Sequence, residues 1–304
     1  MKKDFISLAD MTADELREML ELAGKIKASP GVFADSLAMK SFALVFEKPS
    51  TRTRVSFQVG ISQLGGASFY LAPQDVGLGV REDVRDVART LERYLNGVIL
   101  RTYEHETIIE FARHSRMSVI NGLSNRLHPC QALSDIFTMQ EKKRDLASAK
   151  IAFVGDGNNV LHSLLFAVGK LGLALTVATP QKYRPDEEIV KEALGYASSS
   201  GAQIQFVTDP HQAARGADVL YTDVWVSMGQ EAERERRLRD FAGFQVDRAL
   251  LSLAKDTCCV MHCLPAHRNE EITDEVLEGP RSIVFDQAEN RMHVQKAILL
   301  YLFK

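Results

Sequence analysis

The chain has 304 residues, of which 45% are apolar and 25% charged, and its formal net charge is −3. This length is enough for two domains, and the composition is typical of a soluble globular enzyme. The charge balance gives no indication of binding to nucleic acid or to an acidic membrane surface. No apolar run reaches the roughly 18 residues of a membrane span, and the first residues lack the apolar core of a secretion signal, so we expect a cytoplasmic location.

Four cysteines lie at positions 130, 258, 259 and 263. No two of them form a C-x-x-C pair, so their spacing predicts neither a zinc site nor a disulfide framework. We therefore expect no metal, and nothing in the composition calls for a cofactor.

Strands and helices are predicted to alternate through the first half of the chain. Thr12 and Glu15 form a capping box at the start of a helix over 12–27. Gly65 and Gly66 end a later helix, and residues 73–81 are expected to form a mobile loop. Apolar runs and helical spacing predict strands at 41–46, 67–71, 97–100 and 118–121, helices at 53–64, 82–95 and 106–114, and a longer connecting helix over 127–145.

The alternation resumes in the second half of the chain. The predicted strands are 150–154, 173–178, 203–207, 218–222, 258–261 and 282–285. The predicted helices are 160–171, 186–199, 210–215, 233–240, 247–254 and 273–278, with a last helix over 287–303. This order predicts an α/β fold with two doubly wound parallel-sheet domains joined by helices. In such sheets ligands bind outside the carboxyl ends of the strands, and we expect a cleft between the domains.

A dense set of hydroxyl and cationic side chains follows the first strand. Pro49 stops the strand, and Ser50 and Thr51 are good N-cap residues for the next helix. A helix N-terminus binds anions through free N–H groups and a partial positive charge. Arg52 and Arg54 add guanidinium groups that suit phosphate oxygens. Positive charges in the first turn oppose the helix dipole, so a phosphate site explains them better than a solvated helix face does.

Polar side chains also follow two further strands. Arg101 comes directly after the strand 97–100, although an exposed surface arginine is an equally good interpretation of this residue alone. His128 begins the connecting helix, where the dipole lowers the pKa of a histidine and favours the neutral ring. A neutral ring can donate one hydrogen bond to a carbonyl oxygen, and Gln131 lies on the same helical face. A capping histidine beside a solvent-facing glutamine is the alternative.

The stretch 153–160, Phe-Val-Gly-Asp-Gly-Asn-Asn-Val, invites a dinucleotide-binding interpretation. Its form is G-x-G-x-x-V, one glycine short of the fingerprint, and the next strand ends without the acidic residue that the fingerprint needs. We therefore disfavour an NAD-dependent oxidoreductase. Asn158 and Asn159 could instead bind a carboxylate through their side-chain N–H groups, or form a tight turn before the helix 160–171.

The last two strand ends carry an acid and a thiol. Asp223 follows the strand 218–222 and is suited to hold a cationic amine. Cys263 follows the strand 258–261 and is reactive only if its thiolate is stabilised, whereas a buried inert thiol is the usual alternative. Leu264-Pro265 predicts a restricted turn in which a cis peptide is allowed.

Taken together, these motifs resemble those of the aspartate/ornithine carbamoyltransferase family. The likeness runs from Phe46 to Arg291 and rests on residues 50–54, 128–131, 223 with 227–229, and 262–265. The first two motifs resemble the wider family, and the last two resemble its ornithine-specific members. The resemblance implies a transferase of arginine metabolism that converts carbamoyl phosphate and L-ornithine to L-citrulline and phosphate, in the biosynthetic or the degradative direction.

The resemblance also implies a domain organisation and an assembly. Residues 1–135, completed by a C-terminal helix over 287–304, would bind carbamoyl phosphate, and residues 136–286 would bind ornithine. The last helix would pack back on the first domain. Family members assemble homotrimers, or multiples of trimers, with active sites at subunit boundaries.

Site residues follow from the resemblance position by position. Carbamoyl phosphate would be bound by Ser50, Thr51, Arg52, Thr53, Arg101, His128, Gln131, Cys263, Leu264 and Arg291. Ornithine would be bound by Asn159, Asp223, Ser227 and Met228. Catalysis would rest on Cys263, Arg101, His128 and Arg291.

One position departs from the pattern. Relatives place a Gln or His in the loop before Glu82 to reach a neighbouring subunit's phosphate, and the aligned residue here is Gly77. Either Gln74 or Arg81 takes that role, or the contact is absent.

In the implied reaction the substrate's own δ-amine attacks, so no covalent enzyme intermediate is needed, and the protein orients and stabilises charge. A Cys263 thiolate or the leaving phosphate would accept the amine proton. Three alternatives are a carbamoyltransferase for a diamine or an acylated ornithine, the dinucleotide-dependent oxidoreductase, and a catalytically silent binding protein.

Overall fold

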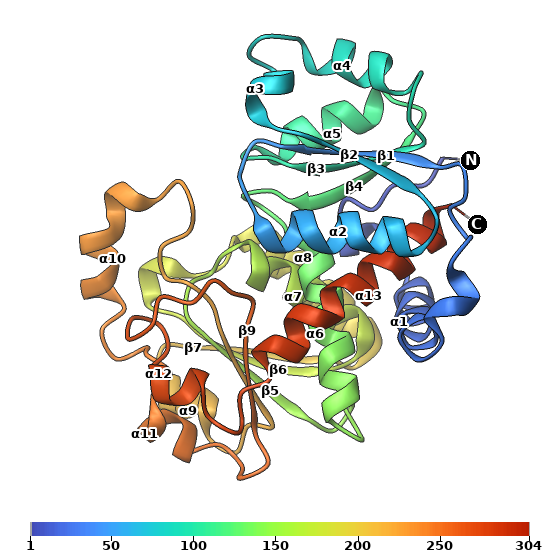
Figure 1. The fold of residues 1–304 in the computed structure, drawn as a ribbon. Coiled ribbons are helices and arrows are strands. Elements are labelled where there is room, and N and C mark those ends of the chain that lie inside the picture. Colours follow the sequence, from blue (N-terminus) through green and yellow to red (C-terminus); the bar gives the residue numbers. More distant parts are fainter. Residues whose placement is uncertain (1, 304) are drawn as a thin grey trace. The chain divides into compact units, whose positions relative to one another are not determined.

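A computed structural model describes residues 2–303 (Figure 1). The chain divides into two compact units, one formed by residues 1–137 with 289–304 and the other by residues 138–288. The divisions fall within two helices, α6 (Pro129–Lys142) and α13 (Val284–Leu302).

The first unit is built on a four-stranded parallel sheet in the order β2-β1-β3-β4. Its strands are β1 (Ser41–Phe46), β2 (Ala67–Leu71), β3 (Gly97–Arg101) and β4 (Ser118–Leu123). Helix α2 (Thr51–Gln63) covers one face, and α4 (Val84–Leu91) and α5 (His105–Arg113) cover the other (Figure 1). This unit also contains α1 (Ala13–Ala28), α3 (Pro73–Val76) and the 3-10 turns η1 (Leu8–Asp10) and η2 (Pro30–Phe33).

Alternation along the strands explains this layering. Ala43, Val45, Val98 and Leu100 lie in the core cluster that also contains residues of α4 and α5. Their neighbours along the strands are buried on the opposite face, because successive side chains of a strand point to opposite sides. Both faces of the sheet are therefore apolar, as the sequence predicts for a parallel sheet.

The end of the chain packs back on the first unit, as predicted. The ring of Phe303 meets that of Phe42 of β1 edge-on, with ring centroids 5.0 Å apart. The amine of Lys296 on α13 donates to Gln63 of α2 at 2.8 Å, and a side chain at Gly60 would lie 3.2 Å from the Lys296 stem. Gly60 therefore allows α13 to approach α2 closely.

The second unit is built on a five-stranded parallel sheet in the order β7-β6-β5-β8-β9. Its strands are β5 (Lys150–Val154), β6 (Ala174–Ala178), β7 (Gln203–Val207), β8 (Val219–Thr222) and β9 (Cys259–His262). Its helices are α7 (Asn159–Leu171), α8 (Glu187–Ser200), α9 (Pro210–Ala214), α10 (Arg234–Asp240), α11 (Arg248–Ser252) and α12 (Asp274–Leu277), with η3 (Gln181–Tyr183) and η4 (Glu231–Glu233). Residues of α9, α11 and α12 share one core cluster with β5, β8 and β9. The other face is covered by α7 (Figure 1), in which every residue from 160 to 169 is buried.

The predicted fold class, two doubly wound parallel-sheet domains, is confirmed, but some predicted elements are wrong. The expected strand 282–285 is a single bridge between Ser282 and Val260, and α13 already begins at Val284. A short apolar run does not by itself distinguish a strand from a buried helix start. Helix α6 is shorter than the predicted 127–145, and the expected loop 73–81 contains the short helix α3.

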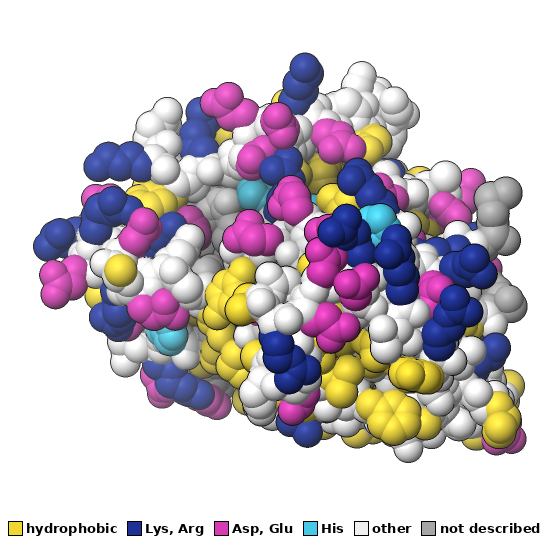
Figure 2. Space-filling view, turned by 90° about the horizontal axis from the view of Figure 1, so that it is seen from above, with side chains coloured by type: hydrophobic (Ala, Val, Ile, Leu, Met, Phe, Trp, Pro, Cys, Tyr) yellow, Lys and Arg dark blue, Asp and Glu magenta, His cyan; other side chains and the backbone are white. Residues whose placement is uncertain are grey.

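The charges on the surface are mixed where Figure 2 shows it. On the face seen in Figure 2, lysine and arginine side chains are interspersed with aspartate and glutamate side chains, and this face presents no continuous basic surface. Within residues 2–303, no helix is both long enough and apolar enough to cross a bilayer.

The packing of α7 on α8 generates a stability prediction. An added Cβ at Gly169 of α7 would lie 2.7 Å from the carbonyl oxygen of Ala193 on α8, whereas a Cβ at Gly195 of α8 would meet nothing within 4 Å. We expect Gly169→Ala to lower the free energy of unfolding by about 1–3 kcal/mol through overpacking. Gly195→Ala should leave stability unchanged or raise it by about 0.5–1 kcal/mol through helix propensity. Chemical denaturation of both variants measures this, and equal effects at the two glycines would contradict it.

Candidate active site

The start of α2 is arranged as the sequence predicts. Ser50 is the N-cap, and its hydroxyl accepts from the Thr53 N–H at 3.2 Å and donates to the Thr53 hydroxyl at 3.0 Å. Arg54 is occupied, because its guanidinium stacks 3.8 Å from the Tyr70 ring and donates to Gln58. Arg52 is half-buried, and its side chain forms no hydrogen bond or ion pair within residues 2–303. The guanidinium of Arg52 is therefore available to an anion at this helix N-terminus.

Arg291 links this helix start to α6. Its buried guanidinium donates through Nη2 to the Thr53 hydroxyl at 3.0 Å and through Nη1 to the Gln131 side-chain oxygen at 2.9 Å. Gln131 in turn donates to Asp135 at 2.8 Å. These contacts fix the side chains of three helices in one hydrogen-bonded network.

Arg101 and His128 complete the group in the first unit. Arg101 is the last residue of β3 and is buried, which excludes the exposed surface position. His128 immediately precedes α6 and is also buried. Burial lowers the pKa of His128 well below its usual range, and the charges of Arg291 and Arg101 lower this pKa further. The predicted neutral ring follows from burial and the two arginines, where the sequence suggested the helix dipole.

In the second unit, Asp223 is held by residues that follow two other strands. It follows β8 and accepts from the Asn158 amide at 2.7 Å and from the Cys263 thiol at 2.9 Å. The Asn158 side-chain oxygen also caps α7, so Asn158 orients Asp223 while Asn159 is the first residue of that helix. Cys263 follows β9, and its Sγ lies 2.9 Å from Asp223 Oδ1, the geometry of a thiol that donates to the carboxylate.

Ser227, Met228 and Leu264 lie on the loops that follow β8 and β9, and Thr51 lies in the first unit. Ser227 donates its backbone N–H to Gln230 at 3.1 Å, and Met228 beside it is 43% exposed. Leu264 donates its N–H to His262, and the Leu264–Pro265 peptide is cis, as the sequence allows. Thr51 is exposed in the first turn of α2. The predicted residues thus form two groups, one in each unit.

One residue of this edge was missed from the sequence. Arg237 lies in α10, within a run of charges that reads as a solvated helix, yet its side chain is buried. It pairs with Asp156 at 3.1 Å and donates to the Trp225 carbonyl at 2.9 Å. It therefore ties the loop that carries Ser227 to the strand end at Asp156. The sequence signal that could have indicated an ion-paired Arg237 is its i,i+4 spacing from Glu233, and the two side chains lie 3.0 Å apart.

Two groups of side chains have the composition of metal ligands within the described residues. They are Asp223 with His262 and Cys263, and His267 with Glu270 and Glu271. Neither was predicted, because neither has a regular ligand spacing in the sequence.

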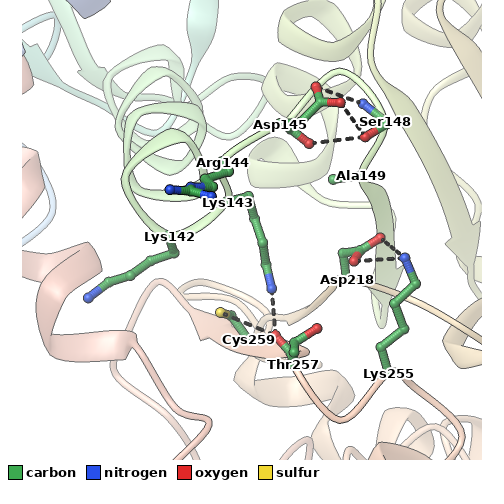
Figure 3. Close-up of a pocket in the computed structure, with 10 residues that line it drawn as sticks. All are labelled: Lys142, Lys143, Arg144, Asp145, Ser148, Ala149, Asp218, Lys255, Thr257 and Cys259. Carbon is green, nitrogen blue, oxygen red and sulfur yellow. Dashed lines mark hydrogen bonds and ion pairs between the residues drawn. The ribbon is translucent and has the colours of Figure 1, made fainter.

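A separate hollow of about 310 Å³ lies in the second unit (Figure 3). Lys150, Asp218 and Cys259 stand at the amino ends of β5, β8 and β9, so the hollow is at the opposite edge of the sheet from Asp223. Its charges are largely engaged: Lys255 pairs with Asp218, and Lys143 donates to the Thr257 carbonyl. The hollow therefore has no part in the site described above.

Comparisons with known proteins establish the family of the chain. The model of the aspartate/ornithine carbamoyltransferase carbamoyl-P binding domain matches residues 3–141, and that of the Asp/Orn binding domain matches residues 147–302. The chain belongs to the aspartate/ornithine carbamoyltransferase family. It is 53% identical to an ornithine carbamoyltransferase of Archaeoglobus fulgidus over 302 residues, which cover 99% of this chain and 97% of the relative.

Solved structures of this carbamoyltransferase family have the same fold. The ornithine carbamoyltransferase of Pyrococcus furiosus superposes with a TM-score of 0.95 at 48% identity, covering 98% of this chain and 96% of its own. That of Thermus thermophilus superposes with a TM-score of 0.90 at 46% identity, covering both chains completely.

The buried Asp156 generates a prediction of pH dependence. Burial raises the pKa of Asp156 to about 7, with Arg237 opposing and Asp223 adding to the shift. A carboxyl whose pKa is raised in the folded state favours folding while protonated, so this contribution is lost as the pH rises toward and past about 7. From about pH 5 to about pH 8, wild type should lose on the order of 2 kcal/mol of unfolding free energy relative to Asp156→Asn. Denaturation curves of both proteins across this range measure the difference, and a constant difference would rule out the raised pKa.

Proposed function

We propose that the chain transfers the carbamoyl group of carbamoyl phosphate to the δ-amine of L-ornithine, giving L-citrulline and phosphate. The observation that carries the proposal is the cationic group of the first unit. There, the guanidinium of Arg52, which has no partner among residues 2–303, stands at a helix N-terminus, and Arg101 and Arg291 are buried in the same unit. Relatives about half identical over nearly the whole chain carry the name ornithine carbamoyltransferase.

Residues 1–135 with the C-terminal helix over 287–304 form the carbamoyl-phosphate-binding domain in this proposal. The phosphate lies at the start of α2, where N–H groups and hydroxyls meet Arg52. Arg101, His128, Gln131 and Arg291 hold the carbamoyl group. The residues proposed to bind carbamoyl phosphate from this domain are Ser50, Thr51, Arg52, Thr53, Arg101, His128, Gln131 and Arg291.

Residues 136–286 form the ornithine-binding domain. Asp223 pairs with the α-amine, since a buried carboxylate is the strongest partner for an ammonium group. Ser227 and Met228 contact the same amine and its neighbouring backbone, and Asn159 binds the α-carboxylate. Cys263 and Leu264 contact the carbamoyl group and the reacting δ-amine.

The chemistry requires orientation and charge stabilisation. Attack of the amine places negative charge on the carbamoyl oxygen, and a neutral His128 and the Arg101 guanidinium can both donate to it. Arg52 stabilises the phosphate as it leaves. The thiol of Cys263 already donates to Asp223, which favours the leaving phosphate as the acceptor of the amine proton.

We further propose that the protein is a cytoplasmic homotrimer of arginine metabolism. Val55 and Val59 on α2 and Phe69 on the adjacent β2 are 51%, 39% and 53% exposed, and burial of such apolar side chains favours association. Light scattering of the purified protein measures the subunit number.

Arg81 is the better candidate for the contact that relatives make to a neighbouring phosphate. A Cβ at Gly77 would lie 2.6 Å from the Arg81 Cβ, so a side chain at position 77 is incompatible with this arrangement. Arg81 is exposed and carries the positive charge that Gln74 lacks.

The direct test is a citrulline assay with ornithine, putrescine and N-acetylornithine as acceptors. Only ornithine offers both a free α-amine and an α-carboxylate, so it should have the highest kcat/KM. A preference for putrescine or N-acetylornithine would assign the chain to another acceptor.

Arg52→Ala tests the phosphate site. Losing a bidentate, charge-assisted phosphate contact should cost about 3 kcal/mol of transition-state stabilisation, so turnover should fall about a hundredfold or more. The matched control is Arg54→Ala in the same helical turn, which should lose much less because Arg54 stacks on Tyr70. Near-normal turnover of Arg52→Ala, with intact folding, would contradict the phosphate site.

Asp223→Asn tests the amine site. We expect a strong rise in the KM for ornithine and little change in the KM for carbamoyl phosphate, because the two substrates are assigned to different domains. Steady-state kinetics with each substrate varied in turn separate these effects. An equal loss for both substrates would show that Asp223 has a structural role.

A further inference from the structure

The loop after β9 contains a group of possible metal ligands that the proposed reaction does not use. The group consists of His267, Glu270 and Glu271, and one ligand atom from each lies within 4.8 Å of the other two. It lies four or more residues beyond Cys263, in the segment between β9 and α12.

Glu271 is the buried member of this group. Its side chain is 0% exposed, and its Oε1 accepts from His262 Nε2 at 3.0 Å and from the His267 backbone N–H at 2.6 Å. Its other oxygen, Oε2, is buried and has no hydrogen-bond partner within residues 2–303. An unpartnered carboxylate oxygen away from water is unfavourable unless a cation or donor satisfies it.

Glu270 and His267 each place a possible ligand atom within 4.8 Å of one from Glu271. Glu270 Oε1 pairs with Arg234, while Glu270 Oε2 is buried, has no hydrogen-bond partner in the described chain, and lies 3.8 Å from His267 Nδ1. Arg234 is the cation that faces the group, and Arg268 is engaged with Asp274 and Glu278.

Hydrogen bonds within the loop and from Gln245 hold the backbone of this segment in place. Glu270 donates its N–H to the His267 carbonyl at 2.9 Å, and Asn269 donates to the Ile272 carbonyl at 2.8 Å. The Gln245 amide donates to the carbonyls of both Asn269 and Glu270 at 2.8 Å. Ordering the loop therefore requires little further loss of entropy when an ion binds.

We propose that His267 Nδ1, Glu270 Oε2 and Glu271 Oε2 bind one divalent first-row transition ion, with water at its remaining positions. Two carboxylate oxygens and one imidazole nitrogen are ligands that suit Zn²⁺, Mn²⁺ and Co²⁺. The ion neutralises the two buried carboxylate oxygens that the protein leaves without partners.

The neighbouring group of Asp223, His262 and Cys263 is less suited to an ion. Both ring nitrogens of His262 are engaged, since Nδ1 accepts from the Leu264 N–H and Nε2 donates to Glu271. Cys263 is a thiol that donates to Asp223. An ion there would have to break the Cys263–Asp223 hydrogen bond and one of the two hydrogen bonds of His262, whereas the proposed site offers two oxygens without partners among the described residues.

The test is a titration of the chelator-treated full-length protein with Co²⁺, without substrates, followed by calorimetry and by absorption. We expect one ion per chain, with visible d–d bands and no intense sulfur-to-cobalt band in the near ultraviolet. Because no substrate is present, the outcome is independent of the proposed function.

Variants assign the ion to its ligands. His267→Ala and Glu270→Gln change partly exposed side chains and should weaken Co²⁺ binding at least tenfold, since even outer-shell changes cost about tenfold or more. Cys263→Ser and His211→Ala, the latter a histidine beside Asp209 on α9, should leave the Co²⁺ affinity unchanged. The proposal is overturned if the protein binds no Co²⁺, or if Cys263→Ser abolishes binding while His267→Ala retains it.

Discussion

The cationic group of the first unit depends on the buried guanidinium of Arg291. This group donates to Thr53 at the start of α2 and to Gln131 on α6, so residues far apart in the sequence are fixed by one side chain. Burying a cation is unfavourable unless its hydrogen bonds are satisfied and its field is used. Arg101 adds a second buried guanidinium, and together the two lower the pKa of His128 beyond the effect of its burial. The two guanidinium groups would thus bind an anion and also favour the neutral ring of His128, which is proposed to donate to the carbamoyl oxygen.

The edge of each sheet at which the proposed site residues lie could be predicted from the sequence, because parallel strands place their carboxyl ends together and the polar residues follow those ends directly. Arg101, Asp223 and Cys263 were found in this way, and so was the helix start at Ser50. The role of Asn158 in holding Asp223 could not be predicted: its side-chain amide donates to Asp223, and its side-chain oxygen caps α7, of which Asn159 is the first residue. The dihedral angles of the cap set this arrangement, and composition does not encode them.

Tertiary burial was the other source of error. Arg237 lies among charges that would suit a solvated helix, and only the packing of the loop around Trp225 makes it a buried anchor. Glu271 follows Glu270 in a charged, polar segment of the sequence. Its side chain is nevertheless fully buried and accepts a hydrogen bond from His262. The apolar run before α13 reads as a strand, but it pairs through Ser282 alone. In each case tertiary packing decides the burial of the residue, and local propensity and pattern are overridden by it.

The hydrogen bond between Cys263 and Asp223 bears on whether Cys263 can act as a proton acceptor. While the thiol donates to Asp223, a thiolate at Cys263 would face a carboxylate across the same short distance, and two like charges there disfavour each other. An ammonium group that binds Asp223 would replace the thiol as its donor and would bring a compensating positive charge. The thiol would then lose this acceptor, and its sulfur could act as a weak acceptor for a second amine. On this argument the proposed role of Cys263 depends on Asp223: an acceptor substrate that lacks the α-amine would leave the hydrogen bond between Cys263 and Asp223 intact.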